Sequence, residues 1–282
     1  MASNEEIIQI ATTFLLNAPP GEFLDVVSDV RTLLPSESLL NSTASSTFRE
    51  YNTQQMHVAN TSKGAQVLIT KEGELNHNEY LDPKNKQIVT FDHIKQAVTN
   101  TRSIGSELDS DVEPYRSAVE EEAIRYCHEY YPHGNVAVYG SKVSEGYKVT
   151  ICLASAQYNP SNFWNGKWRS VWTCTFKPNQ GQVTLNAKIQ INVHYYEDGN
   201  VQLNTVTEKS TTAPSGDAAT TAANIIKAIS KTELALHSSI DSSYTTMGET
   251  TFKALRRALP INRCKINWQK VRGFKIGSEL SK

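Results

Sequence analysis

The chain has few cysteines and no long apolar run. Its four cysteines are widely spaced and form no Cys-x-x-Cys pair: Cys127, Cys152, Cys174 and Cys264. This spacing predicts reduced, buried thiols rather than a disulfide framework. No segment approaches the roughly 18 apolar residues that a membrane-spanning helix needs, so we expect no transmembrane segment. The acidic start, MASNEEIIQI, lacks the basic and apolar regions of a secretory signal and predicts a cytoplasmic protein.

Motifs of catalysis are also missing. The sequence has no Gly-rich phosphate loop and no Gly-x-Ser-x-Gly elbow, and its seven histidines never cluster with cysteine or acid at metal-ligand spacing. His128 and Glu129 begin like a zinc-protease helix motif, but Pro132 stands where the second histidine belongs. We therefore predict that the protein is not an enzyme and uses no catalytic residue, metal or cofactor. For His194, on a strand, we predict a hydrogen-bonded structural role.

Positive charge is scarce in most of the chain and concentrated at its end. Residues 253–282 hold nine of the 28 Lys and Arg residues and one acid, whereas the other 252 residues carry 19 basic and 28 acidic groups. A basic tail on an acidic body predicts an acidic partner surface. We expect no nucleic acid partner, because the acidic body would repel phosphates.

The first 51 residues have the apolar spacing of a small helical bundle. Ser3 and Glu6 fit a capping box, which predicts a first helix. Breaks at Pro19-Pro20-Gly21 and at Pro35 separate this helix from two others. The apolar positions of the first two helices are Ile7, Ile10, Ala11, Phe14 and Leu15, followed by Phe23, Leu24, Val27, Val30, Leu33 and Leu34. We predict a three-helix bundle over residues 1–51.

The apolar period then changes from that of a helix to that of a strand. Residues 52–113 are predicted to form a small β region, with strands at 66–70 and 87–91 and a polar connection from 99 to 113. Pro114 opens a predicted helix that stops before Pro132. Five antiparallel strands are expected after it, at 136–139, 147–156, 168–176, 182–196 and 201–207. The fourth should present one apolar face: Leu185, Ala187, Ile189, Ile191, Val193 and Tyr195. An Asp198-Gly199 hairpin should join it to the fifth.

A long helix is predicted from residue 217 to about residue 257. At about 1.5 Å per residue, it would be roughly 60 Å long, which is more than a compact domain is wide. Its Ser- and Thr-rich polar face gives little intrinsic stability, so the helix needs packing along its length. The alternatives are strong curvature or a second subunit, and we favour the second subunit. The predicted dimer interface is the apolar stripe Ile226, Ile229, Leu236, Ile240 and Met247.

Residues 260–282 are predicted to form a separate amphipathic tail. Pro260 ends or kinks the long helix. An apolar stripe follows at steps of three and four residues: Ile261, Cys264, Trp268, Val271 and Phe274. The residue pattern leaves open whether this helix folds back on its own core, enters an apolar cleft of an acidic partner, binds anionic lipid or meets a calmodulin-like reader. Its basic charge disfavours the first alternative.

Three sequence segments resemble the alpha subunit family of F-actin capping protein. They are Val193–Val201 (VHYYEDGNV), Phe252–Pro260 (FKALRRALP) and Phe163–Ser170 (FWNGKWRS). The order of elements agrees over essentially the whole chain. The resemblance implies an α+β fold, in which residues 114–259 form a dimerisation core whose five-stranded sheet is crossed by the long helix and continued by a similar beta subunit. Residues 260–282 would be a mobile tentacle.

The resemblance also implies a function and its residues. The family caps the barbed ends of actin filaments at the cytoskeleton and cell cortex, and anionic phosphoinositide lipids and protein regulators are expected partners. The alternative is a phosphoinositide-binding cortical scaffold without capping activity. Carried over by motif, Lys253, Arg257 and Arg263 would bind both actin and phosphoinositides. The other expected actin contacts are Lys265, Trp268, Lys270, Val271, Arg272 and Lys275.

Overall fold

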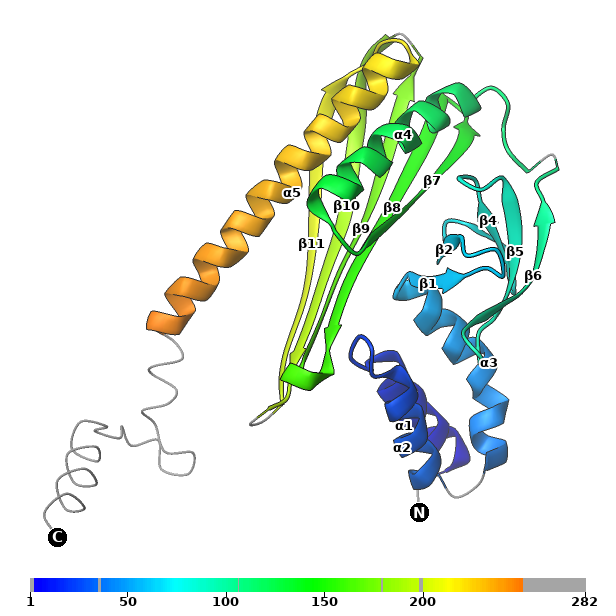
Figure 1. Cartoon of the computed structure of the whole chain (residues 1–282), viewed down its shortest axis with the longest axis vertical. Coiled ribbons are helices and arrows are strands. Elements are labelled where there is room, and N and C mark those ends of the chain that lie inside the picture. Colours follow the sequence, from blue (N-terminus) through cyan, green and yellow to red (C-terminus); the bar gives the residue numbers. More distant parts are fainter. Residues whose placement is uncertain (1–2, 35–36, 106, 179, 198–199, 251–282) are drawn as a thin grey trace, which may run out of the picture. The chain divides into compact units, whose positions relative to one another are not determined.

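The computed structural model describes residues 3–34, 37–105, 107–178, 180–197 and 200–250. Helices and strands within these residues give an α+β fold (Figure 1). The chain divides into two compact units, Met1–Ala228 and Ile229–Lys282. None of the described helices is both long and apolar enough to cross a membrane.

Three helices open the chain, as predicted: α1 (Asn4–Leu16), α2 (Phe23–Leu33) and α3 (Glu37–Gln54). Ser3 and Glu6 form the expected capping box at the start of α1. A shared core of the bundle includes Leu15, Phe23 and Tyr51, and the rings of Phe23 and Tyr51 are stacked with centroids 3.9 Å apart. The third helix continues to Gln54, three residues past the predicted boundary at residue 51.

The apolar faces predicted for these helices were only partly right. Ile10 and Phe14 of α1 are 53% and 57% exposed, and Leu24 and Leu33 of α2 are 60% and 79% exposed. A helix of this bundle buries a narrow stripe, because only the positions that face the two other helices lose contact with water. The remaining apolar side chains therefore lie on the surface of the single chain.

The following segment contains more strands than the sequence predicted. It forms a two-stranded sheet and a four-stranded antiparallel sheet from six strands: β1 (His57–Asn60), β2 (Gln66–Ile69), β3 (Glu74–Asn76), β4 (Glu79–Asp82), β5 (Gln87–Asp92) and β6 (Ala97–Ser103). The strand β6 occupies the start of the segment predicted as a polar connection. Its side chains are mostly exposed, so they lack the apolar alternation that indicates a strand.

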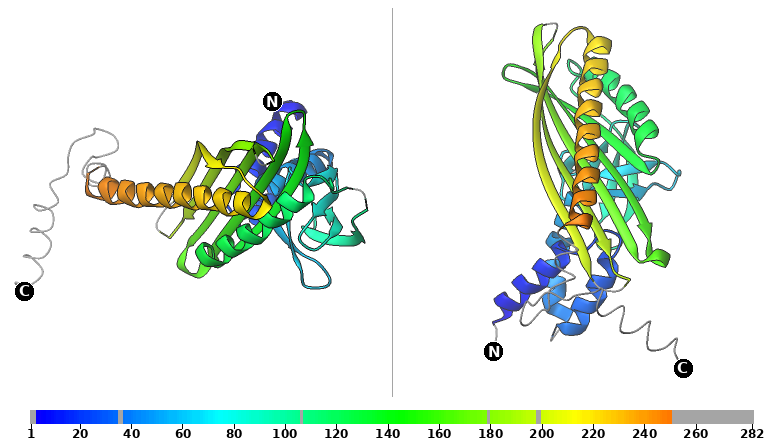
Figure 2. Two further views of the ribbon diagram at one scale, coloured as in Figure 1. Left: turned by 90° about the horizontal axis from the view of Figure 1, so that it is seen from above. Right: turned by 90° about the vertical axis from the view of Figure 1, so that its left-hand side faces the viewer.

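The five-stranded antiparallel meander is confirmed, with spatial order β11-β10-β9-β8-β7. Every strand is longer than predicted: β7 (Gly134–Val143), β8 (Gly146–Asn159), β9 (Trp164–Lys177), β10 (Gln180–Tyr195) and β11 (Val201–Pro214). Figures 1 and 2 show these strands as one twisted layer. Residues 198 and 199 of the predicted hairpin turn lie outside the described residues, while Tyr195 and Val201 pair at its base.

One face of this sheet is apolar and covered by helices. The helix α4 (Glu113–Tyr130) packs on β7 and β8, and the start of α5 (Ala218–Glu249) lies on the same face as α4 (Figures 1 and 2). Tyr115 of α4 donates a hydrogen bond to the carbonyl of Gly216, just before α5, at 3.3 Å. Among the described residues, Trp172 of β9 has the largest fully buried side chain. Cys127, Cys152 and Cys174 are buried and form no disulfide, as predicted, and Cys264 lies outside the described residues.

The predicted alternation of β10 holds over its middle and reverses at its end. Leu185, Ala187 and Ile189 are buried, as expected. Near the end, His194 is only 6% exposed whereas Tyr195 is 40% exposed, which is opposite to the prediction. The reason is that Glu22, from the α1–α2 connection, packs against the polar face of the sheet at this point. Burial there follows a tertiary contact rather than the strand's own pattern.

Candidate functional site

The predicted actin-binding side chains cannot be placed on the fold. Residues 251–282 lie outside the described residues, and this range contains all nine of them: Lys253, Arg257, Arg263, Lys265, Trp268, Lys270, Val271, Arg272 and Lys275. The roles of these side chains in binding actin and phosphoinositides therefore stay predictions. The predicted boundary between core and tail at residues 259 and 260 falls in the same range.

The predicted dimer stripe on α5 changes its exposure along the helix. Ile226 and Ile229 are 9% and 2% exposed, so both are already buried in the single chain. Leu236 and Ile240 are half-buried, and Met247 is 40% exposed. The part of the stripe that remains available to a partner therefore begins after Ile229.

Two of the three segments that carry the family resemblance lie side by side in the sheet. Phe163–Ser170 enters β9 and Val193–Val201 spans the end of β10, and the two are joined by strand pairing that sets Asn165 opposite His194. Both side chains bind one carboxylate. The Nδ1 atom of His194 lies 2.7 Å from Glu22 Oε1, and Asn165 Nδ2 donates to the same oxygen at 2.8 Å. The structural role predicted for His194 is confirmed.

The backbone of the connection between α1 and α2 brings the carboxylate of Glu22 close to the sheet. Gly21 has a φ of +83°, a conformation that favours glycine. A Cβ atom at Gly21 would lie 2.9 Å from the ring of Tyr158 on β8. Glycine thus allows the connection to approach the sheet closely, and the next residue, Glu22, reaches His194. The sequence motifs of the sheet therefore hold the N-terminal bundle in place.

Two buried cations lie on the same face of β9, next to this contact. Lys167 and Arg169 are 8% and 3% exposed. The Arg169 guanidinium donates to the carbonyl oxygen of Gln54 on α3 and to Asn192 Oδ1 on β10. Burial and the nearby Arg169 lower the pKa of Lys167 to about 7, and burial lowers the pKa of Arg169 to about 10. Among the described residues, neither cation forms an ion pair with a carboxylate.

Replacing Lys167 with methionine is expected to stabilise the fold by about 1–4 kcal/mol at pH 7, because a buried charge would become apolar. The pKa of Lys167 falls from 10.5 to about 7 on folding, so protonation costs the folded state free energy that the unfolded state does not lose. The gain should be full below pH 7 and shrink as the pH rises toward 10.5, where both states become neutral. Urea unfolding across this pH range measures it.

The matched control for this substitution is Lys188→Met. Lys188 lies on the same face of the sheet, on β10, but is exposed. Its replacement should leave the unfolding free energy within about 0.5 kcal/mol of the parent value. A loss of stability in Lys167→Met at pH 7 would contradict the prediction and show that the ammonium group has a compensating partner.

The polar face of the sheet also borders a pocket of about 180 Å³ beside Arg169. Its walls come from the α1–α2 connection, the end of α3 and the strands β9, β10 and β11. The lining is rich in side-chain amides, among them Gln54, Gln55, Gln190, Asn192, Gln202 and Asn204. Sequence reasoning missed this site, because its walls come from segments far apart in the chain.

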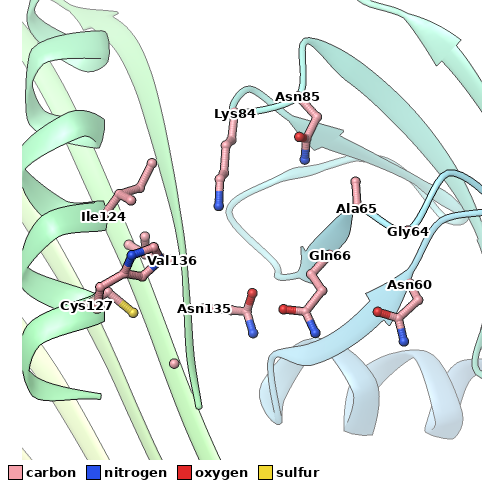
Figure 3. Close-up of a pocket in the computed structure, with 12 residues that line it drawn as sticks. Asn60, Gly64, Ala65, Gln66, Lys84, Asn85, Ile124, Cys127, Asn135 and Val136 are labelled. Atoms are coloured by element: carbon pink, nitrogen blue, oxygen red, sulfur yellow. The ribbon is translucent and has the colours of Figure 1, made fainter. Parts of the chain in front are cut away.

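A second cleft, of about 330 Å³, lies between α4, β7 and the small β region. Figure 3 shows Ile124 and Cys127 on one side and Asn60 and Gln66 on the other, with Lys84 reaching toward the space between them. Apart from His128 and Lys84, its polar side chains are neutral amides. Within the described part of the chain, no group of three His, Cys, Asp or Glu residues has the arrangement of a metal site.

Known proteins are similar to this chain over nearly its whole length. A family model described as F-actin capping protein alpha subunit matches residues 11–279. The chain is 67% identical over 282 residues to the F-actin-capping protein subunit alpha of Dictyostelium discoideum, and the match covers 100% of both chains. It is 36% identical over 286 residues to the corresponding subunit of Arabidopsis thaliana, with 97% of this chain and 92% of the relative covered.

A solved structure is similar in fold. The homodimeric actin capping protein alpha subunit from Plasmodium berghei superimposes with a TM-score of 0.73 at 22% identity, covering 84% of this chain and 92% of that one. The fold of the described residues is therefore found in that subunit. The family match also includes most of the basic tail, since it runs to residue 279.

Proposed function

This chain belongs to the F-actin capping protein alpha subunit family, whose members cap actin filaments, and we propose that it does so as a heterodimer with a capping protein beta subunit. The heterodimer blocks both addition and loss of actin at the fast-growing barbed end. Membership favours capping over the alternative of a phosphoinositide-binding scaffold. It also places the chain among structural actin-binding proteins of the cytoskeleton.

The edge strand β11 supports pairing with another subunit. In the described residues β11 ends the five-stranded sheet and pairs with β10 alone. An open edge this long presents a row of unpaired backbone groups, to which another strand can add. Exposed apolar side chains accompany it, since Val201 and Val206 are 61% and 58% exposed. In the proposed heterodimer the beta subunit continues the sheet beyond β11, and the exposed part of the α5 stripe packs against it.

The basic tail is the proposed actin-binding segment. Lys253, Arg257 and Arg263 would meet an acidic surface of actin, and the stripe around Trp268 and Val271 would enter an apolar cleft. The remaining contacts are assigned to the basic side chains of the same helix: Lys265, Lys270, Arg272 and Lys275. Exposed charges act over a Debye length of about 8 Å in physiological salt, so they steer and orient. Apolar burial then holds the docked state.

Regulation would act through the same basic residues. Anionic phosphoinositides bind clustered Lys and Arg side chains. We assign Lys253, Arg257 and Arg263 to this binding, which makes lipid a competitor of actin. Protein regulators with acidic surfaces would act in the same way. The proposed location is the cytoplasm, at the actin-rich cell cortex.

Growth of actin from filament seeds tests the function. Substoichiometric amounts of the purified heterodimer should stop elongation at barbed ends in a pyrene fluorescence assay, because one heterodimer blocks one end. A matched assay with barbed ends already capped by an unrelated protein controls for sequestration of free actin. Continued barbed-end growth in the presence of excess heterodimer would favour the scaffold alternative.

The chain expressed without a beta subunit is expected to be largely insoluble, because the β11 edge and the apolar side chains of α5 would remain uncovered. Co-expression with a beta chain should return most of it to the soluble fraction. Light scattering and thermal unfolding of the soluble material measure the outcome. A monodisperse, cooperatively unfolding monomer would contradict the shared sheet. A soluble dimer of this chain alone would instead match the homodimer described for Plasmodium berghei.

A further inference from the structure

The pocket beside Arg169 contains a cation with an incomplete set of partners. Arg169 is 3% exposed, and its two recorded hydrogen bonds go to neutral oxygens, those of Gln54 and Asn192. Its Nε atom is buried and has no hydrogen-bond partner. Burying a guanidinium N–H without a partner is costly, and burying the charge without a counter-ion costs more. This side chain therefore has unused capacity for an anion.

Groups near Arg169 also bear on whether an anion can bind there. Lys167, two residues earlier on the same face of β9, adds a second buried cation. The carboxylate of Glu22, on the same face of the sheet, is already bound by His194 and Asn165. The Oε1 atom of Gln55, another lining residue, is also buried without a partner. A carboxylate can satisfy the donor of Arg169 but not the acceptor of Gln55, because an ionised carboxylate only accepts hydrogen bonds.

We propose that the pocket between the α1–α2 connection, the end of α3 and strands β9–β11 binds a carboxylate group, with Arg169 as its charged partner. Its volume of about 180 Å³ accommodates a carboxylate on a short side chain. Two of the five guanidinium N–H groups are used by Gln54 and Asn192, and the other three together with the neutral amide lining suit a planar monoanion. Phosphate groups are usually held by several backbone N–H groups at a helix N-terminus or by clustered basic side chains, and the pocket lining contains one arginine and one histidine besides its amides.

The pocket lies where the N-terminal bundle meets the sheet, so a bound carboxylate would affect how the two associate. Its walls join the N-terminal bundle, through Gln54 and Pro19, to the sheet, through Asn192 and Gln202. A carboxylate bound there would contact both and stabilise their association. The carboxylate has two possible sources, a free organic acid or the side chain of an acidic peptide segment, and the two present the same group to Arg169.

Thermal unfolding with sodium acetate as the probe tests the proposal. The full-length chain is used in the assembly in which it is soluble, with acetate replacing chloride at constant ionic strength. We expect a saturating rise in Tm of about 2–4 °C, because a ligand that binds only the folded state stabilises it by mass action. Gln202→Glu, which places a negative charge at the exposed rim, should abolish the rise. Thr212→Glu, an exposed position farther along β11, makes the same charge change outside the pocket and should retain it.

A second substitution and a second probe sharpen the result. Arg169→Lys keeps the charge but lacks the Nε–H, so the acetate concentration at half-saturation should increase at least tenfold. Acetyl-glutamate methylamide, which imitates a side chain in a peptide, should half-saturate at a lower concentration than acetate if the source is a peptide and not if it is a free acid. An absent Tm rise, or an equal rise in all variants, would overturn the proposal. Equal saturation by sulfate would also overturn it.

Discussion

Replacing Lys253, Arg257 and Arg263 with glutamate is expected to slow association of the heterodimer with barbed ends at least tenfold at low salt. The reversal turns attraction toward an acidic actin surface into repulsion, and this acts during encounter, before close contacts form. The effect should shrink as salt is added, since screening shortens the range of both forces. Single-filament measurements of the capping rate at two salt concentrations test this expectation.

The control for this prediction reverses three lysines far from the tail in sequence. Lys63, Lys71 and Lys95 are exposed in the small β region, so their replacement with glutamate changes the net charge equally. That variant should associate at nearly the parent rate. If both triple variants slow equally, net charge and not the tail sets the rate. If the tail variant associates normally at low salt, the basic residues are a structural part of the core.

Trp268→Ala is expected to speed the dissociation of the cap from barbed ends by about 30-fold, with little change in the association rate. Buried tryptophans at the centre of an interface typically contribute about 2 kcal/mol or more to binding. This contribution arises only after docking, so its loss appears in the dissociation rate. Uncapping of single filaments measures it directly.

Two further variants test whether the tail contacts actin or packs on the core of the heterodimer. Trp268→Phe keeps an aromatic ring and should recover most of the residence time. Deleting residues 260–282 should remove much of the electrostatic contribution and the apolar contribution while the heterodimer stays folded, because the deletion begins after the long helix and leaves only Lys253 and Arg257 of the three reversed positions. Unfolding of the heterodimer on this deletion would show that the tail packs on the core. Dissociation unchanged by Trp268→Ala would show that the tryptophan lies outside the contact.

Local signals in the sequence predicted most of the elements. The capping box of Ser3 and Glu6 and the alternation of Leu185, Ala187 and Ile189 depend on neighbours within a few residues, and the structure confirms both. The strand β6 was missed because its exposed, polar side chains carry no period. Exposure of Phe14 and Leu24 was missed because a helical pattern shows which residues are apolar, but not how wide a face the bundle covers.

The burial of Lys167 and Arg169 could not be predicted from such local signals. Lys167 and Arg169 are visible as a Lys-x-Arg pair between tryptophans, but the sequence does not show that both would be buried. The surroundings of Arg169 come from Gln54, Asn192 and the α1–α2 connection, which are far from Arg169 in the sequence. The family resemblance identified the segments 163–170 and 193–201 but not their structural role. In the structure, Asn165 and His194 from these segments bind the carboxylate of Glu22.

The contact between Glu22 and His194 also sets the order of events while the chain is being made. The two residues are 172 positions apart, and bacterial or eukaryotic ribosomes add about 5–20 residues per second. Glu22 is therefore added to the chain roughly 10–35 s before His194. During this interval the carboxylate of Glu22 lacks both His194 and Asn165, the side chains that bind it in the finished fold. Synthesis slowed between residues 22 and 194 would lengthen that interval and lower the yield of folded subunit.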